Sequence, residues 1–139
     1  GMGRVGDLEK EMTLEELTKR IKRTLNAKTI RAAGDPQKPI RKLAIVSGSG
    51  MSLAMEAKVA GADAILTGDA KYHAAAEAAE AGIAVVDAGH FSTERPAMAQ
   101  LIQGLQAHLN ALQCKSDIMT VLCLADENDV FWTAGNAVE

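Results

Sequence analysis

The stretch from Leu43 to Asp87 decides the fold, and it reads LAIVSGSGMSLAMEAKVAGADAILTGDAKYHAAAEAAEAGIAVVD. Short apolar runs punctuate it, starting near Ala44, Ala64 and Ala84. These runs are typical of buried parallel strands, while the alanine- and glutamate-rich segments between them, about 52–60 and 70–81, favour helices that end at a glycine. Strands and helices alternating at this spacing predict right-handed βαβ units. We therefore expect an α/β fold, a three-layer sandwich with a mostly parallel central sheet.

Elements on either side extend this pattern. Residues 13–16 read Thr-Leu-Glu-Glu, which is a capping box, and apolar residues then recur at positions 14, 17, 21 and 25, so a helix is expected there. The runs 29–33 and 42–46 flank a loop rich in Gly and Pro, which predicts two neighbouring strands. Beyond the decisive stretch we expect a long helix from about Ser92 to Gln113, a strand over 118–124 and an edge strand around 130–133.

Composition limits the class of protein. The 139 residues are 47% hydrophobic, and 15 Lys and Arg against 18 Asp and Glu give a net charge of -3. One globular domain is expected, over residues 3–139, with Gly1-Met2 as the remnant of a cleaved tag. The charge and the 3% aromatic content argue against a nucleic-acid or anionic-membrane partner, and no apolar run is long enough to span a bilayer. Cys114 and Cys123 lack a Cys-x-x-Cys spacing, which favours reduced thiols and a cytoplasmic protein.

Two acid/histidine pairs follow two of the expected strands. Asp69 precedes His73 by four residues, and His90 precedes Glu94 by the same spacing. This spacing places side chains on one face of a helix, and ligands of open α/β sheets bind beyond the carboxyl ends of the strands. An imidazole and a carboxylate suit zinc, iron or manganese. Alternatively, Glu94 has only a structural role, because its negative charge stabilises the N-terminus of a helix that Ser92 or Thr93 caps. His90 is then an ordinary loop residue with a hydrogen bond.

The segment around Asp69 also has two interpretations. Asp69 is a natural N-cap for the helix that carries His73, and that role alone explains an aspartate there. The pair could instead orient metal ligands, because metal-bound histidines usually donate their second N–H to a carboxylate. Tyr72, the only tyrosine, is either a proton donor beside this pair or a residue at the edge of the core.

A glycine-rich turn follows the first strand of the repeat. Its residues Gly48, Ser49 and Gly50 could cradle a phosphate or another anion with free N–H groups. The turn lacks the dinucleotide fingerprint, since Leu53 occupies the position of the third glycine. Close packing explains the two glycines equally well.

Four motifs in register resemble the Nif3-like family, whose members are often labelled GTP cyclohydrolase I type 2 homologs. They are Gly-Arg-Val-Gly at 3–6, Val-Ser-Gly-Ser-Gly at 46–50, Thr-Gly-Asp-Ala-Lys-Tyr-His at 67–73 and Asp-Ala-Gly-His-Phe-Ser-Thr-Glu at 87–94. The resemblance covers about residues 3–133. It implies two α/β halves that face each other across a dinuclear metal site, of which this chain resembles the second half. It also implies that His90 and Glu94 bind divalent metal, and that Asp69 and His73 line the same cleft.

This chain lacks some of the metal ligands that the family pattern includes. The first half of the family supplies a His-His pair and an Asp to the metals, and the three histidines here are all separate. We therefore expect the chain to bind metal poorly alone, because stable sites usually use three or four protein ligands. The chain is either an excised C-terminal domain, which its abrupt start favours, or a natural half-protein that has lost the site. The expected partners are the missing N-terminal half and further copies of the same chain.

The resemblance implies a metal-dependent hydrolase acting on a nucleotide-type substrate, with this fragment inactive by itself. His73 would shuttle a proton with Asp69 as its orienter, and the turn at 48–50 with Tyr72 would hold a phosphate-like part of the substrate. A different class remains open: a non-catalytic, metal-dependent scaffold or regulatory module that forms oligomers and binds a protein partner. A third interpretation is a metal-free domain whose glycine turn binds a nucleotide.

Overall fold

The computed structural model describes residues 2–111 and residue 130 of the chain. The chain divides into two compact units, one up to Thr93 and one from Glu94. The strands predicted at 118–124 and 130–133 lie outside the described residues, except for Val130, and so do both cysteines. The prediction of one domain over residues 3–139 therefore stays a prediction.

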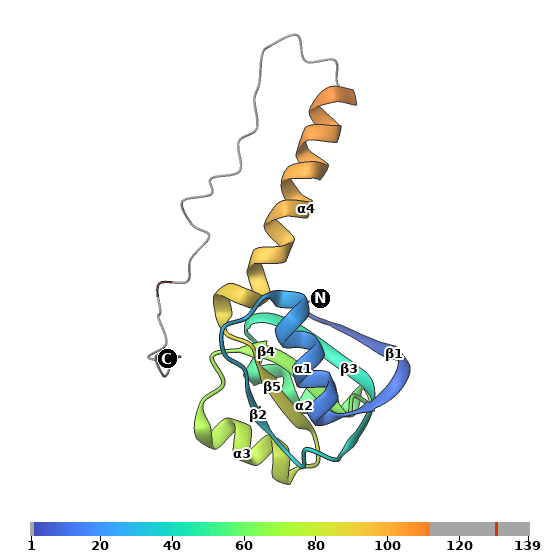
Figure 1. Ribbon diagram of the computed structural model, residues 1–139, viewed down its shortest axis with the longest axis vertical. Coiled ribbons are helices and arrows are strands. Elements are labelled where there is room, and N and C mark those ends of the chain that lie inside the picture. The colour runs from blue at the N-terminus through green and yellow to red at the C-terminus, as the bar shows by residue number, and fades with distance from the viewer. Residues whose placement is uncertain (1, 112–129, 131–139) are drawn as a thin grey trace, which may run out of the picture. The chain divides into compact units, whose positions relative to one another are not determined.

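A five-stranded sheet forms the centre of the first unit (Figure 1). Its strands lie in the order β1 (Arg4–Thr13), β3 (Pro39–Ser49), β4 (Ala64–Gly68), β5 (Ala84–Asp87) and β2 (Arg31–Ala33). The three central strands are mutually parallel, and the two edge strands run antiparallel to their neighbours. The predicted mostly parallel central sheet is confirmed.

Helices cover both faces of this sheet, because alternate side chains of a strand point to opposite sides. Ala64 and Leu66 of β4 pack in the cluster that contains the buried stripe of α1 (Leu14–Leu25). Ile65, between them, packs in the other cluster, with alanines of α2 (Ala54–Val59) and α3 (Tyr72–Glu80). The three predicted layers are thus present in the first unit.

The start of α1 follows the predicted capping box. The Thr13 hydroxyl accepts a hydrogen bond from the Glu16 N–H at 3.2 Å, and the Glu16 carboxylate accepts one from the Thr13 N–H at 2.9 Å. The predicted apolar stripe is buried at Leu14, Leu17 and Ile21.

At the edges of the sheet, one predicted pairing of strands is wrong and one strand was not predicted. The run 29–33 forms β2 over Arg31–Ala33, yet it pairs with β5 at the far side of the sheet and not with β3. Strand β1 was not predicted, because charged residues dominate it and only Leu8 and Met12 pack partly against the core. An edge strand with one solvated face needs little apolar character.

The helices after β3, β4 and β5 match the predicted order, with small changes at their starts. A 3₁₀ turn, η1 (Met51–Leu53), precedes α2, and α4 (His90–Ala111) begins two residues earlier than expected. The first helical residue is therefore His90, so Ser92 and Thr93 lie inside the helix and the prediction that they cap it is wrong. Searched over its described residues, the structure contains no helix with the length and apolar character of a bilayer span.

Candidate functional site

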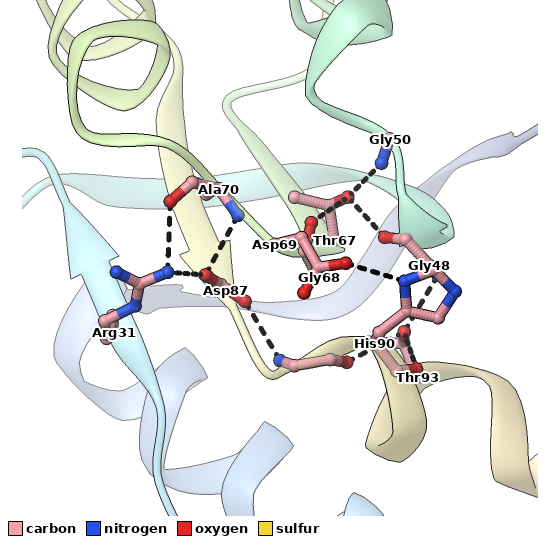
Figure 2. Close-up of polar contacts among 11 residues, drawn as sticks. Arg31, Gly48, Gly50, Thr67, Gly68, Asp69, Ala70, Asp87, His90 and Thr93 are labelled. Carbon is pink, nitrogen blue, oxygen red and sulfur yellow. Dashed lines mark hydrogen bonds and ion pairs between the residues drawn. The ribbon is translucent and has the colours of Figure 1, made fainter. Parts of the chain in front are cut away.

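Three turns meet where the parallel strands β3, β4 and β5 end (Figure 2). Gly48 lies at the end of β3 and Gly50 follows that strand directly, while the turn after β4 contains Asp69 and the turn after β5 contains Gly89. Parallel strands carry their carboxyl ends to one edge, which is where open α/β sheets bind ligands. The candidate residues from the sequence lie on or beside these turns, and two of them, Asp69 and His90, are in contact.

The contact joins Asp69 to His90. The Asp69 Oδ2 and the His90 Nδ1 lie 2.7 Å apart, and both side chains are about half exposed. Asp69 holds a left-handed backbone with φ of 55°, which an aspartate tolerates better than most residues. Asp69 lies before α3, and the N-cap residue of that helix is Lys71. No side chain forms a capping hydrogen bond there. The prediction that Asp69 caps this helix is therefore wrong, because its carboxylate bonds with His90 instead.

The chemistry of the two groups fixes the direction of this hydrogen bond. An ionised carboxylate only accepts, so the His90 Nδ1 carries the proton and donates it. The neutral ring then has its lone pair on Nε2. This arrangement is the one in which metal-binding histidines are usually held by a carboxylate.

Asp87, the last residue of β5, is a functional candidate that the sequence analysis missed. Its side chain is buried, and its Oδ1 accepts the Gly89 N–H at 2.9 Å while its Oδ2 accepts the Ala70 N–H at 3.0 Å. Oδ2 also forms an ion pair with Arg31 of β2 (Figure 2). A lone carboxylate that ends a buried apolar strand was the available clue, since such a group needs partners.

Threonine hydroxyls engage the glycine-rich turn. Thr67, which is fully buried, accepts the Gly50 N–H at 2.8 Å and donates to the Gly48 carbonyl at 3.0 Å. The Gly48 N–H donates to the Thr93 hydroxyl at 2.9 Å. These two glycine N–H groups are thus not free in this conformation, contrary to the expectation of an open anion cradle. Binding of an anion by Gly48, Ser49 and Gly50 stays a prediction.

Gly68 lets the turns after β4 and β5 approach each other closely. A Cβ added there would lie 2.6 Å from the backbone nitrogen of His90 and 2.7 Å from the carbonyl carbon of Gly89. Backbone atoms cannot give way cheaply at such distances, so only glycine fits. The absence of a side chain at this position brings Asp69 within reach of His90.

The other predicted residues near Asp69 lie on α3. Tyr72 and His73 are exposed, and their rings meet edge to face with centroids 5.4 Å apart. Because Asp69 precedes the helix, the four-residue spacing does not place it on a helix face with His73. Tyr72 instead lines a cavity of about 270 Å³ together with Arg31, Asp87 and several alanines.

Glu94 belongs to α4, four residues after His90. Within residues 2–111 and 130, no three His, Cys, Asp or Glu side chains gather into a group that could hold a metal ion. The described residues do not make a complete metal site by themselves, although a histidine held at Nδ1 has suitable chemistry for one ligand of such a site.

Comparison with known proteins gives one family. The family model described as Duf34/NIF3 (NGG1p interacting factor 3) matches residues 1–124. A Clostridium acetobutylicum protein named GTP cyclohydrolase 1 type 2 homolog is 40% identical over 119 residues, which are 86% of this chain and 44% of that protein. A Clostridium perfringens protein of the same name is 41% identical over 111 residues, 80% of this chain and 42% of its own length.

Solved structures agree with these matches. A crystal structure of a Staphylococcus aureus protein superposes with a TM-score of 0.78 at 32% identity, covering 86% of this chain and 40% of that one. A Bacillus cereus protein described as related to NIF3 gives a TM-score of 0.78 at 33% identity, covering 86% of this chain and 34% of that one. This chain therefore spans less than half the length of each of these relatives.

Proposed function

Because this chain belongs to the Duf34/NIF3 family, we propose that it forms one half of a dinuclear metal site, with His90 and Glu94 as its ligands. The remaining ligands would come from the other half of the family fold, which this chain lacks. The complete protein would be a metal-dependent hydrolase, and its ions would be zinc, iron or manganese.

The observation that carries this proposal is the hydrogen bond between Asp69 and His90. Here the ring is held at Nδ1 by a carboxylate whose backbone adopts the rarely populated left-handed conformation. A carboxylate that accepts the Nδ1 proton makes Nε2 the ring nitrogen with which His90 would bind a metal ion.

Bound divalent ions would polarise a substrate and lower the pKa of a water molecule towards neutrality. The residues of this chain would bind and orient: Asp69 fixes the ring of His90, and His73 moves a proton at the edge of the cleft. The relatives named GTP cyclohydrolase 1 type 2 homolog support a nucleotide-type substrate for this proposal.

The ligand assignment is tested in the complete protein, in which this chain is joined to the other half of the family fold. We expect the double variant His90→Ala and Glu94→Ala to lose most of its bound metal without unfolding, because two ligands of a shared site are removed. The measurement is metal per chain by elemental mass spectrometry after dialysis, with circular dichroism as the check on folding.

His108→Ala is the matched control, because it deletes a histidine of the same helix that has no role in the proposed site. It should keep its metal. Unchanged metal content in the folded double variant would contradict the assignment of His90 and Glu94.

A further inference from the structure

One buried carboxylate, that of Asp87, connects the two turns that carry Asp69 and His90. Its Oδ2 accepts the N–H of Ala70, the residue after Asp69, and its Oδ1 accepts the N–H of Gly89, the residue before His90. Each oxygen therefore holds the backbone next to one member of the pair. Figure 2 shows the carboxylate between the two turns.

We propose that Asp87 is the positioning residue of the Asp69–His90 pair and that Arg31 is its counter-ion. Through them, β5 and β2 set the ring orientation of the proposed metal ligand. The inference about metal binding rests on the proposed function, whereas the inference about ring orientation does not.

Hydrogen bonds and a counter-ion surround the buried carboxylate of Asp87. Its side chain is only 6% exposed, so the ionised form is stable only where hydrogen bonds and a counter-ion replace water. The two backbone N–H groups and the Arg31 guanidinium supply these partners. Arg31 lies opposite Asp87 in the antiparallel register of β2 and β5, so the sheet itself brings the pair together.

Arg31 adds a second attachment to the same turn. Its Nη2 donates to the Ala70 carbonyl at 3.0 Å as well as to Asp87. The residue after Asp69 is thus fixed through its N–H by Asp87 and through its carbonyl by Arg31.

Asp69 needs this attachment because of its backbone. A residue with a Cβ rarely keeps a φ of 55°, and the conformation persists only where neighbouring atoms impose it. Released at Ala70, the Asp69 backbone would relax to the ordinary region, and its carboxylate would swing away from His90. Without the hydrogen bond to the Gly89 N–H, the backbone at His90 would no longer be held in place, and the position of its ring would no longer be fixed.

The variant Asp87→Asn tests whether the hydrogen bonds of Asp87, and not only the size of its side chain, position the Asp69–His90 pair. Asparagine has nearly the same size but only one accepting oxygen, and its NH₂ group can only donate. It can satisfy one backbone N–H and would present a donor to the other, while Arg31 loses its counter-ion. We expect the Asp69–His90 bond to break in a chain that still folds.

The readout is the tautomer of His90 in the metal-free chain, from long-range ¹H–¹⁵N imidazole spectra. The His90→Gln variant assigns its signals among the three histidines. The unmodified chain should show the proton on Nδ1. Asp87→Asn should show a mixture of tautomers, as should Asp69→Ala.

Asp63→Asn is the matched control. Asp63 also uses its carboxylate to accept two backbone N–H groups, those of Arg41 and Lys42, at 2.9 and 2.8 Å, but it precedes β4 and so lies at the opposite strand end. Its loss should lower stability and leave the His90 tautomer unchanged. If Asp87→Asn does not fold, Arg31→Gln, which keeps the carboxylate, should give a partial shift towards the mixture.

In the complete protein, Asp87→Asn should raise the dissociation constant for Zn²⁺ by about 10–100-fold, the usual effect of losing a group that orients a ligand, and Asp63→Asn should leave it unchanged. An unaltered His90 tautomer in folded Asp87→Asn, or in folded Arg31→Gln where the first variant fails, would overturn the positioning role. A complete protein that binds no zinc would overturn the proposed function and leave the tautomer result standing.

Discussion

At the scale of single residues, short polar side chains at strand ends organise the candidate site. Asp87 joins the turns after β4 and β5, and Thr67 joins the end of β4 to the turn after β3. Both side chains are buried, and their buried oxygens have hydrogen-bond partners. The exposed members of the site, Asp69 and His90, therefore stand on a backbone that buried hydrogen bonds fix.

Thr67→Val tests the contribution of this buried hydroxyl. Valine has almost the same shape, but it leaves the Gly50 N–H and the Gly48 carbonyl without their partner, which costs about 1–3 kcal/mol of unfolding free energy. Urea denaturation followed by circular dichroism measures this loss.

Thr18→Val is the control, because the Thr18 hydroxyl bonds only to the Glu15 carbonyl on the solvent side of α1. Its unfolding free energy should change by no more than about 0.5 kcal/mol, as for most surface substitutions. Equal effects of the two substitutions would show that the Thr67 hydrogen bonds do not hold the turn.

The sequence predicts the residues of the site better than their partners. Asp69 and His90 stand out because each follows an apolar strand. The four-residue spacing suggested His73 as the partner of Asp69, and that inference assumes that both residues lie in a helix. The left-handed backbone of Asp69 breaks this assumption, and its actual partner is 21 residues away. Spacing along the chain carries no information about such a contact.

At the scale of elements, the features that short segments determine are predicted well. The start of α1 depends on residues 13–16, and its buried face depends on a periodicity that can be counted in the sequence. The βαβ pattern depends likewise on local runs and their order.

Thr13→Ala tests the capping box. The substitution removes the acceptor of the Glu16 N–H at a helix that covers one face of the sheet, so we expect a loss of about 1 kcal/mol in unfolding free energy. Thermal and urea unfolding of the chain would measure it.

Thr24→Ala makes the same chemical change near the other end of α1, where alanine has the higher helix propensity. It should leave stability unchanged or slightly raised. A cap variant as stable as this control would contradict the role of Thr13.

Elements that depend on distant pairing are not predicted. The position of β2 beside β5 depends on antiparallel pairing with residues far along the chain, Val85 to Asp87, and its own three residues contain no sign of that partner. Strand β1 owes its conformation to hydrogen bonds with β3, since half of its own residues are charged. Both cases show tertiary context overriding weak local preference.

At the scale of the whole molecule, the part of the chain that matches a relative of its family covers 44% of that relative. The first unit has a core on each face of its sheet and so has what an independent domain needs. The candidate site lies at one end of that sheet, where it offers a fixed histidine but no complete set of metal ligands among the described residues. The proposed site, shared between two halves of a longer protein, would account for both properties.

The most direct test of this account is metal content, measured by elemental mass spectrometry on the complete, tag-free protein with this 139-residue chain beside it. We predict about two equivalents of divalent metal in the complete protein, as in other two-metal sites, and little in the chain alone. Absence of metal from both would contradict the account and favour a scaffold or regulatory protein that captures a partner. Full occupancy in the chain alone would contradict the division of the site between two halves.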